Sequence, residues 1–119
     1  MWNFIKGIFG RDRYIIRKSD NGEWGFILKA ANGETIGVSE AYERKAGAEN
    51  GVAAVRTYAP DYTAFELRRS TDERHYFVLK ADNGEIILVS ETYDTKAGAR
   101  KGIDAVMRAS QTERVDYKN

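Results

Sequence analysis

The chain has 119 residues, no cysteine, one histidine, and 19 Lys and Arg against 18 Asp and Glu, a formal net charge of +1. This length suits about one domain, and the balanced charge argues against a basic nucleic-acid-binding block or an acidic tail. Without cysteine there are no disulfide bonds and no thiolate metal sites. No apolar run reaches the roughly 18–20 residues that span a bilayer, and no signal peptide is recognisable. We therefore expect a soluble, cytoplasmic protein.

The N-terminal segment, residues 1–13, is predicted to be an apolar arm. Its apolar side chains fall at helical spacings and are Trp2, Phe4, Ile5, Ile8 and Phe9. Ten residues form only a marginal helix in water, so we interpret the segment as an arm that docks on the domain and covers apolar surface. A partner-binding arm and a weak interfacial membrane anchor are the alternatives.

An internal duplication dominates the rest of the sequence. Residues 26–59 align with residues 77–110 over 34 positions without a gap, and 19 positions are identical. Extended upstream, the repeats cover 14–59 and 65–110, with a linker at 60–64. A unit of this size is too small to bury an adequate core alone, so each repeat is expected to complete the core of the other. The domain spans residues 14–110, and residues 111–119 are expected to form a flexible tail.

Each repeat is predicted to fold as three strands and a helix. In the first repeat the strands are expected at 14–19, 24–30 and 34–39, followed by a helix at 45–58. Asn32-Gly33, repeated as Asn83-Gly84, predicts a hairpin with a type I′ turn, which needs positive φ at both positions. The fold class is therefore α+β: two tandem β-β-β-α repeats with an antiparallel sheet, packed as one domain.

Glycines inside the predicted helices indicate close backbone packing. Gly51 and Gly102 each cost about 1 kcal/mol relative to alanine. Because both repeats accept this cost, we expect the helix backbone to pack closely on the sheet or on the other helix.

The two repeats differ at a few positions. Gly37 in the third strand of repeat one corresponds to Leu88, so the equivalent strand of repeat two is apolar on both faces and needs cover. The N-terminal arm is the candidate cover. Further differences are Trp24 against His75, Gly25 against Tyr76 and Arg56 against Met107. A functional site is therefore expected on one half only.

No residues are assigned to catalysis, to a cofactor or to a metal. The single histidine, His75, has no partner or cleft that its spacing reveals, and no nucleotide-binding, serine-hydrolase or zinc-protease motif occurs. The recurring polar residues indicate either a repeated structural joint, which we favour, or a repeated binding element. They are Lys29/Lys80, Glu34/Glu85, Ser39/Ser90, Glu40/Glu91, Tyr42/Tyr93 and Lys45/Lys96.

A basic and aromatic face is predicted on the sheet of the second repeat. Its candidate residues for nucleic-acid or anionic-ligand binding are Arg68, Arg69, Arg74, Tyr76 and Lys80. The acidic residues interleaved with them, Glu66, Asp72, Glu73 and Asp82, reduce the positive potential of this face. Nucleic acid is therefore not the expected partner.

The pattern F-x-L-K-A-x-N-G-E-x-I, followed by V-S-E-x-Y, K-A-G-A and G-[IV]-x-A-V, is similar to that of the YegP-like family. The resemblance covers residues 14–110, and Gly37 departs from it where a larger apolar residue is usual. It implies β(3)-α units paired about a pseudo-twofold axis, with single-repeat members pairing as dimers. It carries no established activity and no catalytic residues to this chain.

These observations predict a non-enzymatic protein-interaction or accessory module with an unidentified protein partner. Binding of nucleic acid or an anionic ligand through the second repeat is the alternative, and an enzyme of unrecognised type comes third. A monomer is expected, because the second repeat occupies the place of a dimer partner. Membrane binding is not expected.

Overall fold

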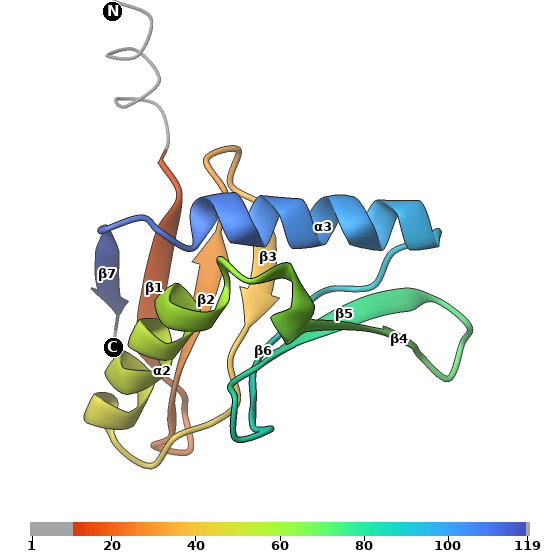
Figure 1. The fold of residues 1–119 in the computed structure, drawn as a ribbon. Helices are drawn as coiled ribbons and strands as arrows, with labels where there is room; N and C mark the ends of the chain where they lie inside the picture. The colour runs from red at the N-terminus through yellow and green to blue at the C-terminus, as the bar shows by residue number, and fades with distance from the viewer. Residues whose placement is uncertain (1–10, 119) are drawn as a thin grey trace, which may run out of the picture.

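The computed structural model describes residues 11–118, which form a seven-stranded sheet with two α-helices against one face (Figure 1). The elements are β1 (Arg13–Lys18), β2 (Trp24–Lys29), β3 (Thr35–Val38), α2 (Lys45–Tyr58), the 3-10 helix η1 (Tyr62–Ala64), β4 (Phe65–Arg69), β5 (His75–Lys80), β6 (Ile86–Val89), α3 (Lys96–Ala109) and β7 (Val115–Lys118). The α+β class and the order β-β-β-α in each repeat are confirmed.

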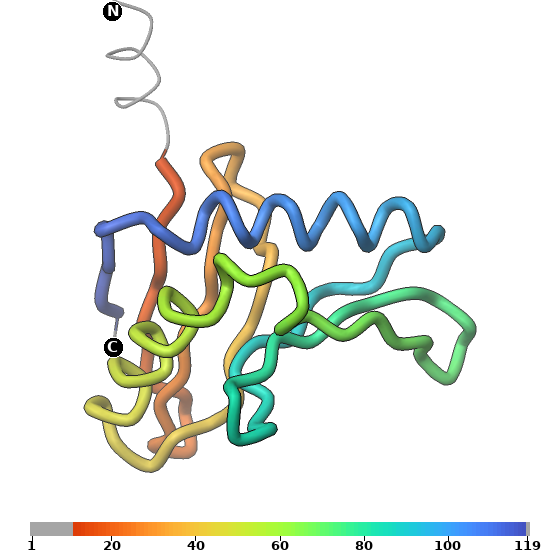
Figure 2. The backbone as a smooth tube through the Cα atoms, in the orientation of Figure 1, coloured from red at the N-terminus to blue at the C-terminus, as the bar shows by residue number. Residues whose placement is uncertain are grey.

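The strand order β4-β5-β6-β3-β2-β1-β7 places the third strands of the two repeats next to each other. These strands, β3 and β6, are antiparallel and pair through Val38 and Val89, which are equivalent residues of the two repeats. Figure 2 shows that the chain continues from α2 into the β4–β5 hairpin, at the opposite end of the sheet from β1, and then runs back along α3. The repeats therefore share one sheet.

A single core lies between the sheet and the helices. It contains the strand residues Tyr14, Phe26 and Phe77 and the helix residues Val55 and Ile103, all buried. Helix α2 contacts β5 and β6 as well as its own strands, and α3 contacts β2 and β3 as well as β5. Each helix thus buries apolar surface from both repeats, as the size of one repeat requires.

The Asn-Gly hairpins are confirmed, but the predicted type I′ turn is wrong. Only the glycines have positive φ, 90° at Gly33 and 88° at Gly84. The Asn32 side chain accepts a hydrogen bond from the Glu34 backbone at 3.0 Å, a local interaction that a turn asparagine makes readily. Each hairpin therefore has a longer loop with one left-handed glycine, and a register shift follows in the paired strands.

Two predictions are wrong: residues 115–118 form strand β7 rather than a flexible tail, and the sheet is not purely antiparallel. This strand pairs in parallel with β1, Tyr14 lying opposite Val115, which makes the sheet mixed. The hydrogen bonds that hold the turn after α3 include one from the Tyr14 hydroxyl to the Ser110 carbonyl at 2.8 Å and one from the Thr112 hydroxyl to the Asp12 carbonyl at 2.7 Å. Four alternating residues are too short a pattern for the sequence to reveal a strand.

The glycines inside the helices are explained by tyrosine and phenylalanine rings. A Cβ atom at Gly51 would lie 2.5 Å from the Tyr42 hydroxyl oxygen and 2.7 Å from the Phe26 ring. Tyr93 and Phe77 crowd Gly102 in the same way. The predicted close approach of helix and sheet is confirmed, and these rings fill it.

Leu88 is buried against the third strand of the other repeat. Its side chain lies over Gly37, where a Cβ atom would meet the Leu88 Cδ2 atom at 2.5 Å. The glycine in one repeat therefore makes room for the leucine of the other. The arm residues Trp2 to Phe9 and their suggested role as a cover lie outside the described residues, while the last residue of the predicted arm, Arg13, begins β1.

Neither α2 nor α3 has the length and apolar content that a helix needs to cross a membrane.

The contact between Gly37 and Leu88 generates a stability prediction. Gly37→Ala should destabilise the fold by about 1–3 kcal/mol, because the new methyl group overpacks the core. Shortening the neighbour by Leu88→Ala removes that clash, so Gly37→Ala should cost less in the Leu88→Ala background. Urea unfolding of the four proteins in a double-mutant cycle measures this coupling. Strictly additive free energies of unfolding would contradict the contact.

Candidate binding surfaces on the sheet

The face of the sheet opposite the helices, which we call the open face, carries no helix from residues 11–118. One cross-strand row on this face passes through all seven strands, at Asp116, Ile15, Ile27, Val38, Val89, Val78 and Glu66. Five neighbouring apolar residues thus lie between two acidic ones. Val38, near the junction of the repeats, is 36% exposed, whereas Ile15, Ile27 and Val78 are buried.

Two residues of the predicted basic face, Arg68 and Lys80, bind Glu66. Its carboxylate accepts hydrogen bonds from Arg68 Nε at 2.5 Å and from Lys80 Nζ at 3.1 Å, and these bonds lower the pKa of Glu66. Tyr76 lies opposite Arg68, and the pKa of the Arg68 guanidinium is raised by Glu66 first and by Tyr76 second. These long side chains surround Val78, which is 1% exposed, so their apolar stems cover it.

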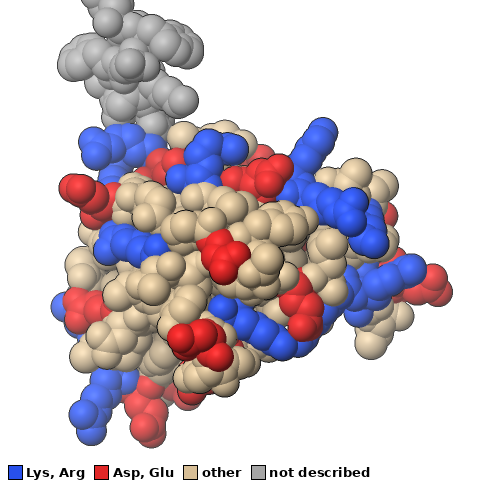
Figure 3. All heavy atoms as spheres, viewed as in Figure 1, with Lys and Arg blue, Asp and Glu red and all other residues tan. Residues whose placement is uncertain are grey.

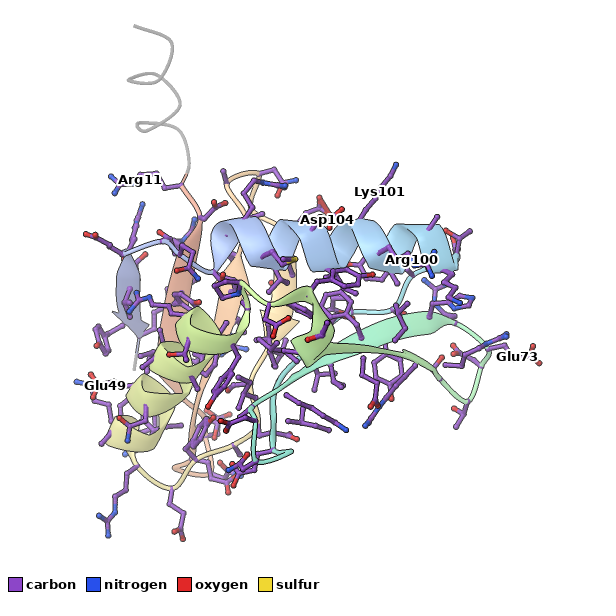
Figure 4. All side chains as sticks on the ribbon, in the orientation of Figure 1. Arg11, Glu49, Glu73, Arg100, Lys101 and Asp104 are labelled. Atoms are coloured by element: carbon purple, nitrogen blue, oxygen red, sulfur yellow. The ribbon has the colours of Figure 1, made fainter. Side chains whose placement is uncertain are left out.

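The other two predicted cations lie elsewhere. Arg69 pairs with Glu73 at 3.3 Å, near the tip of the β4–β5 hairpin where Figure 4 labels Glu73. Arg74 binds Asp94 and the Thr92 hydroxyl, before the start of α3. The structure therefore does not bring the five candidate residues together, and each cation has an acidic partner. On the helix side, Lys and Arg are interspersed with Asp and Glu (Figure 3).

The equivalent place in repeat one is differently built. Ile15, Arg17, Gly25 and Lys29 stand where repeat two has Glu66, Arg68, Tyr76 and Lys80. Among residues 11–118, neither Arg17 nor Lys29 forms an ion pair. A cavity of about 320 Å³ lies over Gly25, and its lining includes Arg17, Ile27 and Val38. Sequence reasoning noted the Gly25-to-Tyr76 difference but missed this cavity, because the pairing that surrounds it is tertiary.

His75 lines a second cavity, of about 300 Å³. The other lining residues are Leu67, Arg68, Arg69 and Lys96, the first residue of α3. No carboxylate is part of this lining, so a histidine–carboxylate pair does not form there. Residues 11–118 also contain no cluster of three or more His, Asp and Glu placed to hold a metal ion.

Two of the recurring polar pairs have the same structural role in both repeats. The Ser39 hydroxyl accepts a hydrogen bond from the Phe26 backbone at 2.9 Å and donates to the Glu40 carbonyl at 2.7 Å, and Ser90 repeats both bonds. Burial raises the pKa of Tyr42 and of Tyr93, whose rings pack under the helix glycines. These contacts favour the interpretation of these pairs as structural joints.

Comparison with known proteins finds the same repeat. A family model described as a domain of unknown function, DUF1508, matches residues 19–66 and 70–116. The UPF0339 protein YegP of Yersinia pestis is 47% identical over 95 residues, which cover 80% of this chain and 85% of the relative.

Two solution NMR structures are similar along nearly the whole chain. The E. coli protein yegP, of unknown function, has a TM-score of 0.86 and 35% identity, covering 92% of this chain and 94% of its own. A UPF0339 protein of Shewanella oneidensis has a TM-score of 0.84 and 37% identity, covering 89% and 90%.

The Glu66 network predicts a pH-dependent contribution to stability. The folded protein lowers the pKa of Glu66 below its ordinary value of 4.5, so this contribution is present above pH 4.5 and is lost as the pH falls through the folded value. Glu66→Gln should therefore destabilise the protein at pH 7 and make little difference at the acid end. Urea unfolding at several pH values checks this, with the exposed Glu43→Gln as the control. A deficit of Glu66→Gln that is equal at all pH values would contradict the network.

Proposed function

The chain belongs to the DUF1508 family, a family of unknown function, and we propose that it is a non-enzymatic interaction module that binds a partner protein through its open face. The observation that carries this proposal is the apolar row across five strands, with no helix of residues 11–118 above it. An apolar centre with a polar rim is the usual anatomy of a protein interface. Here the rim includes Arg13, Arg17 and Lys29 on one side and the Glu66 network on the other.

The proposal treats the chain as a cytoplasmic monomer in which the repeats are related by a pseudo-twofold axis. Antiparallel pairing of the equivalent residues Val38 and Val89 supports the axis. The recurring tyrosines also support it, because the pKa of Tyr42 is raised first by burial and then by Glu85 of the other repeat, and the pKa of Tyr93 first by burial and then by Glu34. The absence of cysteine fits a reducing compartment.

A second candidate function is binding of an anionic ligand at the His75 cavity. Arg68, Arg69 and Lys96 line it, and Lys96 begins α3, where the helix dipole favours negative charge. Salt separates the two candidates. Binding of a single-stranded oligonucleotide there should fall steeply between low and physiological salt and weaken further in Lys96→Gln, whereas contact through the apolar row should persist.

Photo-cross-linking tests the open-face proposal. A benzoylphenylalanine introduced at Val38 should give a discrete protein adduct in cells that naturally contain this chain, because Val38 is the exposed point of the apolar row. Val89→Glu in the same protein should suppress the adduct by placing a charge in the contact. The matched control carries the photo-cross-linker at Lys101, which projects from α3 away from the sheet (Figure 4). No discrete adduct at position 38, or the same adduct from position 101, would reject the open face as the contact.

A further inference from the structure

The open face differs between the repeats chiefly at one place. In repeat two, a tyrosine and a glutamate stand on adjacent strands around Arg68; in repeat one, the equivalent positions hold Gly25 and Ile15. Where Tyr76 carries its ring, repeat one has the cavity of about 320 Å³. A Cβ atom at Gly25 would lie 3.3 Å from the Ser39 hydroxyl, with no closer neighbour, so the strand can carry a side chain there with a small adjustment.

Repeat two shows which side chains fill the space beside this arginine. The Glu66 carboxylate accepts a hydrogen bond from Arg68 Nε at 2.5 Å, and Tyr76 lies directly opposite Arg68 on the adjacent strand. Tyr76 and Glu66 thus fill the space beside the Arg68 guanidinium from within the chain. They supply a phenol and a carboxylate, and Val78 and Val89 form the apolar floor beneath them. Charge-assisted bonds of this kind are stronger than neutral ones.

Repeat one keeps the arginine and the apolar floor but lacks the tyrosine and the glutamate. Arg17 is exposed and has no ion-pair partner among residues 11–118, and Ile27 and Val38 supply the apolar floor. Glu23 and Glu40 also line the cavity. Glu23 lies between β1 and β2 and accepts a hydrogen bond from the Asn21 side chain at 3.1 Å, whereas Glu40 follows β3, on the other side of β2 from Arg17. Arg17 is the one cation of this lining, so an anionic group of the occupant is expected against Arg17, which orients the occupant. A cavity of this volume suits an aromatic ring with its immediate neighbours.

We propose that the cavity over Gly25 binds a tyrosine side chain of the partner protein, with a carboxylate from a neighbouring partner residue against Arg17. The tyrosine ring lies over Gly25 and Ile27, and its hydroxyl and the carboxylate take the places that Tyr76 and Glu66 take beside Arg68. The assignment names the partner's chemistry at the open face and so rests on the proposed function. Aromatic side chains seated in pockets are the usual anchors of protein interfaces.

The test uses the full chain and a defined probe, the blocked dipeptide acetyl-Tyr-Glu-amide, followed by two-dimensional NMR of the protein amides. Saturable shifts are expected at Gly25, Ile27, Val38 and Ser39, which surround the cavity. Acetyl-Ala-Glu-amide, which lacks the ring, should bind about tenfold more weakly or not at all. Free 4-hydroxyphenylacetate separates a small-molecule site from a protein-binding one. Tighter binding of this acid than of the dipeptide would overturn the partner-protein assignment.

Two variants and a control complete the experiment. Gly25→Tyr supplies the internal occupant that repeat two has and should abolish binding. Arg17→Gln removes an exposed cation, leaves the core untouched, and should weaken binding by about tenfold. If Gly25→Tyr fails to fold, Arg17→Gln still decides the question. Tyr76→Phe, in the other repeat, is the matched control and should bind the dipeptide as the native chain does.

The outcomes separate this inference from the proposed function. Saturable shifts at the cavity that Arg17→Gln weakens support the tyrosine assignment. Absence of saturable shifts, or binding that Arg17→Gln leaves unchanged, overturns it. Cross-linking at Val38 does not depend on the dipeptide, so a retained adduct without dipeptide binding rejects the tyrosine and keeps the open-face interaction. Loss of both rejects both.

Discussion

The shared core is the constraint on which the rest of the structure depends. The sheet itself joins the repeats weakly, through one residue pair between β3 and β6. The helices supply most of the connection, because each lies over strands of both repeats. Neither repeat has enough apolar surface to form such a core alone, and no disulfide is available to compensate. Placing both helices on one face of the sheet satisfies this requirement and leaves the other face without a helix from residues 11–118.

Close packing of this core accounts for glycines that local preferences disfavour. The helix glycines allow Tyr42 and Tyr93 to pass beneath the helices, and both repeats use this device. Gly37 is different, because it makes room for Leu88 of the other repeat and has no glycine counterpart. The junction thus has two equivalent strands with unequal side chains, one small and one large. Interiors packed to crystal-like density do not accept two large residues at such a contact.

Agreement and disagreement between the repeats have different meanings. Positions that recur, such as Ser39 with Ser90, make the same backbone contacts twice and are explained by folding alone. Packing of the core does not explain the positions that differ on the open face, above all Gly25 and Tyr76. In repeat two the cations there are neutralised by Glu66, whereas in repeat one Arg17 borders a cavity. We therefore propose that the partner contact lies where the duplication has diverged.

The sequence by itself determined the elements and their order. Gap-free duplication, period-two strands, the Asn-Gly hairpins and the spacing of helix residues are local signals, and they predicted three strands and a helix in each repeat. The close approach at Gly51 and Gly102 was also predictable, because a conformational cost accepted twice indicates a packing reason. The positions of the predicted cations could not be predicted from the sequence. Arg68 and Lys80 share one face of the sheet, whereas Arg69 and Arg74 lie elsewhere.

Only the tertiary structure decided the features that depend on distant pairing. Strand β7 is four residues long and exists because β1 offers it an edge, so no local pattern could separate it from a tail. The turn type at Asn32-Gly33 followed from an asparagine side chain that bonds the backbone. The open face, its apolar row and the cavity over Gly25 arise from register between strands that are far apart in the chain. Register is set by the whole sheet, which is why the candidate site became visible only there.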